Sequence, residues 1–211
     1  MPAMTYIARL LGLVLLSVMV ALFFASFGSG SFTAHMVIHM GIVAVAAPLI
    51  AYGFRDTRFD PLPGMLRVSP MLASFIELVV VWFWHFPTFR TSADASLILS
   101  LVEQASFLVA GVLLWHACFR PKDGRLAGTA GLLFTSLHMT LLGVLLALAP
   151  RPLYGDGDIT CFGIPLSAAA DQQIGGVVML MVGALAYLLG GILLLAGVLR
   201  DGETLRERPR W

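Results

Sequence analysis

The sequence predicts an all-α polytopic membrane protein, a helix bundle of about six transmembrane helices with both termini cytoplasmic. Of its 211 residues, 59% are hydrophobic and only 12% are charged, and the mean hydropathy is +0.91. Soluble domains hold about 45–50% apolar and 25% charged residues. Six apolar stretches also approach the length of about 20 residues that a helix needs to cross a bilayer. We therefore expect one transmembrane domain over residues 1–211.

The predicted helices cover residues 10–27, 34–53, 70–87, 97–118, 128–149 and 172–199. The first helix follows Arg9. It could alternatively be a cleaved secretory signal, although no clear A-x-A cleavage site follows it. The second contains HMVIHMGIVAVAAPLIAYG, and the third ends in the aromatic run WFWHFP. The fourth and fifth are bounded by FRTSADAS and FRPKDGRLA, and the sixth opens with DQQIGG. Each connection holds Gly, Pro, Ser or Asp, which are turn formers.

The basic residues orient these helices. Arg90 and Arg151 fall in loops of one side, whereas eleven basic residues fall on the other side or in the termini. The eleven are Arg9, Arg55, Arg58, Arg67, Arg120, Lys122, Arg125, Arg200, Arg206, Arg208 and Arg210. The positive-inside rule places this larger set in the cytoplasm.

Several function classes are not indicated. The formal net charge is +1 with no basic patch, so nucleic acid is not an expected partner. Cys118 and Cys161 fall on opposite sides of the membrane, so no disulfide between them is expected, and no CxxC pair is present. No GxSxG, HExxH or P-loop motif appears, and we expect no enzymatic activity.

Four histidines on the outer side suggest a metal site. His35 and His39 are four residues apart, so both rings lie on one face of the second helix. His85 ends the third helix and His138 lies near the middle of the fifth, while His116 lies at the inner boundary. A charged side chain at the bilayer centre costs about 2.5–3.5 kcal/mol, so such residues usually have a partner or a function.

Each candidate ligand also has an ordinary explanation. His35 and His85 could be interfacial, and His39 and His138 could form hydrogen bonds within the bundle. Other polar groups expected in the outer half or near the midplane are Glu77, Glu103, Gln104, Asp171 and Gln172. They could orient or charge-balance a bound ion, although Asp171 could simply cap the sixth helix.

Copper fits this set of residue types better than a structural zinc site. Imidazole suits several metals and thioether favours Cu(I), whereas structural zinc usually shows Cys or four compact ligands. Met36, Met40 and Met139 each directly follow one of the histidines and are possible further ligands, although most methionines here are expected to pack.

An ordered set of motifs resembles the polytopic CtaG family of bacterial cytochrome c oxidase assembly proteins. The motifs run through residues 32–182: HMxxHM before AAPL, WHFP, EQASF before LW, His138 before LG, PLY, and DQQIGG before Met179. The resemblance implies a bacterial inner-membrane protein that helps copper reach a haem-copper oxidase. Its expected partners are oxidase subunits or copper chaperones, with the lipid bilayer around it.

The chain departs from the family pattern at one place. The pattern usually has HxxEH around the fourth-helix glutamate, and Ser100 and Gln104 stand at the two histidine positions. Either His35, His39, His85 and His138 hold the site, or metal binding is weaker here than the family implies. The family often has one more span.

Three alternative functions remain open from the sequence. A b-type membrane cytochrome would bind haem between histidines of two helices. A metal or proton transporter would use Glu77, Glu103 and His138 as an internal chain. A metal-free assembly scaffold would bind its partners through lipid-facing surfaces.

Overall fold

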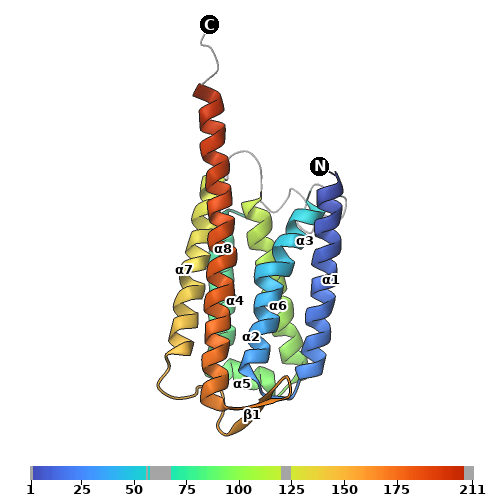
Figure 1. The fold of residues 1–211 in the computed structure, drawn as a ribbon, viewed down its shortest axis with the longest axis vertical. Coiled ribbons are helices and arrows are strands. Elements are labelled where there is room, and N and C mark those ends of the chain that lie inside the picture. Colours follow the sequence, from blue (N-terminus) through green and yellow to red (C-terminus); the bar gives the residue numbers. More distant parts are fainter. Residues whose placement is uncertain (1, 56, 58–67, 120–124, 207–211) are drawn as a thin grey trace.

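The computed structural model is a helix bundle and describes residues 2–55, 57, 68–119 and 125–206 (Figure 1). The prediction of an all-α polytopic bundle is confirmed. Its helices are α1 (Pro2–Ser26), α2 (Phe32–Met40), the π-helix η1 (Gly41–Ala46), α3 (Ala47–Phe54), α4 (Pro70–His85), α5 (Pro87–Asp94), α6 (Leu97–Cys118), α7 (Arg125–Ala147) and α8 (Ala168–Arg206).

Five stretches of the described residues are long and apolar enough to cross a membrane, and the bent pair α4 and α5 makes a sixth if counted as one span. The helices α2, η1 and α3 together form one of the five. The beginning of α1 and the end of α8 lie at the same end of the bundle, as an even number of crossings requires (Figure 1). We call this end inner and the opposite end outer, following the predicted orientation. Of the basic residues used for that orientation, Arg58, Arg67, Arg120, Lys122, Arg208 and Arg210 lie outside the described residues.

The second predicted helix is interrupted by η1, directly after the two histidines. Pro48 has no backbone N–H to donate, and the Ala47 N–H bonds to the Ile42 carbonyl five residues back. The Trp115 indole on α6 donates to the Val43 carbonyl at 3.1 Å. Single π-turns of this kind occur often at functional sites. Here the π-helix begins at Gly41, directly after the turn that carries His39.

The segment predicted as the loop after the third helix contains a helix instead. Phe86 adopts an extended backbone, φ −69° and ψ 130°, which residues before proline favour, and this ends α4. Pro87 then begins α5, and the axes of α4 and α5 differ by 70°. The short helix α5 therefore lies at the outer end of the bundle (Figure 1).

The long outer connection before α8 contains a β-hairpin that the sequence did not predict. Strand β1 (Asp158–Cys161) pairs antiparallel with β2 (Ile164–Ser167), with Cys161 opposite Ile164. Phe162 and Gly163 between them have φ of 46° and 86°, as a two-residue type I′ turn requires. Cys118 and Cys161 are both free and buried, near opposite ends of the bundle.

Glycines allow α7 and α8 to pack closely. A Cβ on Gly143 would lie 2.8 Å from the Leu180 backbone nitrogen, and one on Gly176 would lie 2.6 Å from that of Ala147. In a membrane the association of helices depends on such close backbone contact, because lipid is as apolar as the side chains.

Candidate functional site

Three histidine rings come together in the outer half of the bundle. His35 and His39 on α2 stack one turn apart with ring centroids separated by 6.1 Å. The ring of His85, the last residue of α4, lies 5.9 Å from that of His35 and 5.4 Å from that of His39. All three side chains are buried, and His39 is fully buried. Helices α2 and α4 thus bring together three of the four predicted histidines.

The ring nitrogens of the three histidines differ in their partners. The Nδ1 atom of His85 bonds to the Val81 carbonyl at 2.7 Å, which leaves its Nε2 without a partner. Neither ring nitrogen of His39 has a hydrogen-bond partner, and its ring packs 4.0 Å from that of Phe107. Buried polar atoms without partners are rare in folded proteins and cost about 1–3 kcal/mol each. Three such nitrogens lie in neighbouring rings, which makes this cluster the candidate functional site.

A buried arginine that the sequence reasoning missed completes this cluster. Arg90 on α5 is only 5% exposed, and its Nη1 donates to the Glu103 carboxylate at 2.6 Å. The same Nη1 lies 3.0 Å from Nδ1 of His35, and the guanidinium also forms an ion pair with Asp94 one turn along α5. The signal was present in the sequence, because Arg90 is one of only two basic residues on the outer side.

Glu103 and Gln104 join the cluster from α6. The second carboxylate oxygen of Glu103 lies 3.7 Å from Nε2 of His35 and accepts no hydrogen bond. Nε2 of Gln104 lies 3.3 Å from Nδ1 of His35. Ser100, the other position where the family pattern has histidine, instead donates to the Ala93 carbonyl and ties α6 to α5.

Asp171 holds the helix that carries His35 and His39. Its carboxylate accepts hydrogen bonds from the Ser31 hydroxyl at 2.8 Å and from the backbone nitrogens of Phe32 at 2.6 Å and Thr33 at 3.2 Å. Asp171 therefore caps α2 across the bundle, where the sequence had suggested a cap on its own helix. A negative charge at this end also complements the dipole of α2.

The loop before β1 fixes the outer end of α4. The Tyr154 hydroxyl donates to the His85 carbonyl at 2.7 Å, and the Tyr154 ring stacks on Phe32 with centroids 4.4 Å apart. Burial raises the pKa of Tyr154 above its ordinary value, so the phenol stays protonated and keeps donating. Gln172 holds the same loop, because it accepts from the Leu153 N–H at 2.6 Å and donates to the Leu146 carbonyl at 3.1 Å.

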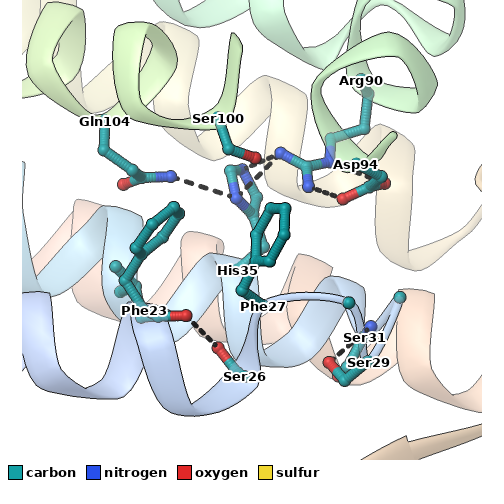
Figure 2. A pocket seen from close by; sticks show the side chains of 13 residues that line it. Phe23, Ser26, Phe27, Ser29, Ser31, His35, Arg90, Asp94, Ser100 and Gln104 are labelled. Carbon is teal, nitrogen blue, oxygen red and sulfur yellow. Dashed lines mark hydrogen bonds and ion pairs between the residues drawn. The ribbon is translucent and has the colours of Figure 1, made fainter. Parts of the chain in front are cut away.

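A polar pocket of about 120 Å³ reaches this cluster from the outer end. Figure 2 shows His35 between Gln104 and Arg90, with Asp94 beside the guanidinium. The turn between α1 and α2 lines the opposite side with serines and glycines, among them Ser29 and Ser31. The pocket gives a small polar solute access to His35.

Two predicted members of the site, His138 and Glu77, contact residues other than the three clustered histidines. His138 on α7 is buried, its ring contacts Phe134, and in the described part of the chain it makes no ring contact with the other three histidines. Both of its ring nitrogens lack a hydrogen-bond partner. Glu77 on α4 is fully buried and accepts a hydrogen bond from the Tyr187 hydroxyl of α8 at 2.8 Å. These contacts place both residues outside the group formed by His35, His39 and His85.

The predicted methionines pack toward α8. A Cβ on Gly175 would lie 3.1 Å from Cγ of Met36, and one on Gly183 would lie 3.4 Å from Cε of Met40 and 3.2 Å from Cβ of Met139. All three methionines are fully or almost fully buried. The contacts described here are therefore packing contacts between helices.

The side chains are not arranged around a common point that could hold an ion. Over residues 2–55, 57, 68–119 and 125–206, no three His, Cys, Asp or Glu side chains lie at the distances that bind a metal. His35 is held by Arg90 and Gln104, and His85 by the Val81 carbonyl. Metal binding by these rings therefore requires side-chain rotation.

The comparison with protein families gives a match over most of the chain. The model of the cytochrome c oxidase caa3 assembly factor family, Caa3_CtaG, matches residues 1–201. The chain belongs to this family. The CtaG resemblance stated from the motifs is thereby confirmed, and membership assigns this multi-pass membrane protein to the assembly factors of cytochrome c oxidase. Comparisons with curated proteins and with solved structures found no match. The buried cluster on α2, α4, α5 and α6 is thus the candidate site of a CtaG protein.

Proposed function

We propose that this protein binds copper at its outer histidine cluster and passes it to cytochrome c oxidase during assembly, in the bacterial inner membrane. Copper is the cargo in this proposal, and His35, His39 and His85 hold it. One observation carries the proposal: His39 and His85 have three buried ring nitrogens without hydrogen-bond partners, in rings 5.4 Å apart.

The chemistry of the donor set fits copper. Neutral imidazole is a common copper ligand, and the cluster offers no thiolate that would bind the ion too firmly for transfer. The unpaired Oε1 of Glu103 supplies a carboxylate oxygen beside His35 that would balance the charge of the cation. Asp171 bonds to the backbone of α2 and Tyr154 to the backbone of α4. These bonds fix the positions of the two helices that carry the three histidine rings.

The size of the pocket favours an ion over haem. Its volume of about 120 Å³ is well below the 300–1,000 Å³ or so of pockets for larger ligands. Phe107 also packs directly on the ring of His39. A b-type cytochrome would show a Soret band after purification, whereas we expect a colourless protein.

The remaining predicted roles belong to the same proposal. His138 stays a predicted fourth ligand, and Met36, Met40 and Met139 stay predicted thioether donors that would have to leave their packing sites. The partners are oxidase subunits or copper chaperones that reach the outer side. The protein acts by binding and transfer in this proposal, and carries out no catalysis.

Removal of the His39 imidazole by substitution tests the proposal. The protein is purified in detergent, loaded with Cu(I), and its bound copper is measured by mass spectrometry. We expect His39→Ala to lose most bound copper and, in cells without the native copy, to lower oxidase copper content. His116→Ala, a buried histidine near the inner end of α6, is the matched control and should bind as the wild type does.

Other results would select the alternative functions. Normal oxidase copper and activity after removal of His35, His39, His85 and His138 together would select a metal-free scaffold. Ion flux in proteoliposomes that Glu77→Gln abolishes would select a transporter. Equal copper retention by the wild type and His39→Ala would contradict the proposed site.

A further inference from the structure

The guanidinium of Arg90 already contacts the two groups that a cation beside His35 would use, the His35 ring and the Glu103 carboxylate. Its Nη1 is 3.0 Å from Nδ1 and 3.4 Å from Nε2 of His35, and it donates to Glu103 at 2.6 Å. A guanidinium is always positively charged and can only donate hydrogen bonds, so a positive charge already occupies the space beside the His35 ring. Arg90 therefore competes with any cation for the same two side chains.

We infer that Arg90 is a displaceable cation that holds the site until copper arrives, and that copper and the guanidinium bind His35 and Glu103 alternately. This inference rests on the proposed copper binding. It deepens the proposal because it names the group that sets how strongly the ion is held. The exchange involves no redox step: the Arg90 guanidinium leaves the carboxylate, Cu(I) takes its place, and each cation carries one positive charge.

Electrostatics make the two occupants exclusive. A copper ion bound to His35 beside an unmoved guanidinium would place two positive charges a few ångströms apart in a buried site, where repulsion is strong. The guanidinium is paired with two carboxylates, Asp94 and Glu103, and Glu103 is the one that also lies beside His35. Binding of the ion at His35 therefore requires the guanidinium to leave Glu103, which can then balance the charge of the ion.

Asp94 can keep the displaced guanidinium of Arg90 in an ion pair. Arg90 is already paired with Asp94, whose side chain is 38% exposed and lines the outer pocket. Both residues lie on α5, one turn apart, so a rotation of the Arg90 side chain keeps this ion pair while the Glu103 contact is broken. The buried positive charge is then never left without a partner, which would be costly.

Release of the cargo follows from the same geometry. When a partner draws copper out through the pocket, the guanidinium returns to Glu103 and His35 and blocks rebinding. The arginine thus lowers the affinity for copper, which suits a protein that transfers its ion.

A competition titration tests this exchange. Purified protein in detergent is titrated with Cu(I) against a chromophoric chelator. We expect Arg90→Gln to bind Cu(I) about tenfold tighter or more, within the range of about 5–150-fold typical of coupled sites, and to release it more slowly. Arg90→Lys keeps the charge and should stay within a few-fold of the wild type. Arg151→Gln, which removes an exposed outer arginine, is the matched control.

The outcomes separate this inference from the proposed function. Wild-type binding that Arg90→Gln leaves unchanged or weakens would overturn the exchange while leaving the copper site in place. Absence of binding in the wild type and in Arg90→Gln would overturn both. If Arg90→Gln fails to fold, Arg90→Gln/Glu103→Gln is compared with Glu103→Gln, and tighter binding by the double variant supports the exchange whereas equal binding contradicts it.

Discussion

Replacement of His39 by leucine should make the metal-free protein more stable while it removes copper binding. His39 is fully buried, and neither of its ring nitrogens has a hydrogen-bond partner. In the proposed copper site these nitrogens bind the ion, so the metal-free protein carries the cost of leaving them without partners. His39→Leu keeps an apolar side chain of similar volume at the position and takes both unpaired atoms away.

The size of the effect follows from the contacts of the ring. Two unpaired nitrogens cost at least about 2 kcal/mol together at about 1 kcal/mol each. Loss of the contact between the His39 and Phe107 rings, whose centroids are 4.0 Å apart, offsets about 0.5–1.5 kcal/mol of this stabilisation. The net stabilisation is therefore about 0.5–1.5 kcal/mol. For a chain of this size the melting temperature should rise by about 1–6 °C, at roughly 2–4 °C for each kcal/mol.

Thermal unfolding in detergent without added metal measures this shift. Ile38→Leu on the same helix is the control, because Ile38 is equally buried and the change removes no polar atom. A volume-conserving swap of this kind usually destabilises by less than about 1.5 kcal/mol. A lower melting temperature for His39→Leu than for Ile38→Leu would mean that the His39 ring stabilises the fold, which is the opposite of the expected result.

Two further predictions concern the frame of the site. Asp171→Asn should lower the free energy of unfolding by about 1.5–3 kcal/mol, because one charged hydrogen bond to the start of α2 is lost. The control Asp156→Asn, in the exposed outer loop, should change the stability little. Equal melting temperatures for the two variants would contradict the capping role of Asp171. Gly176→Ala should destabilise by about 1–3 kcal/mol, because its Cβ would meet the Ala147 backbone at 2.6 Å. In Gly191→Ala the Cβ meets the flexible end of Leu133 at 3.2 Å and comes no closer than 3.7 Å to the backbone, at the Thr129 oxygen. Thermal unfolding of the two variants should therefore differ, and similar values would count against close α7–α8 packing.

The sequence predicted the membrane bundle because apolar length and the positive charges of the loops are local properties. Depth along each helix follows from position in the apolar run, and depth correctly placed His35, His39 and His85 near one level. The spacing of four residues also placed the first two rings on one face of α2.

Rotation of the helices about their axes could not be predicted in the same way. Lipid is as apolar as the bundle interior, so the hydrophobic pattern hardly shows which face of a membrane helix turns inward. Glu77 therefore lies with Tyr187, and His138 beside Phe134, although their depths were consistent with the cluster. Arg90 was missed because its helix is short and polar, and Asp171 caps a helix 139 residues away in the chain.

X-ray absorption at the copper edge of the Cu(I)-loaded protein identifies the atoms that bind the ion. We expect one bound copper with a first shell of imidazole nitrogens, and a shell that loses a nitrogen in His39→Ala. A first shell without imidazole, or one that is identical in the wild type and His39→Ala, would contradict the proposed copper site.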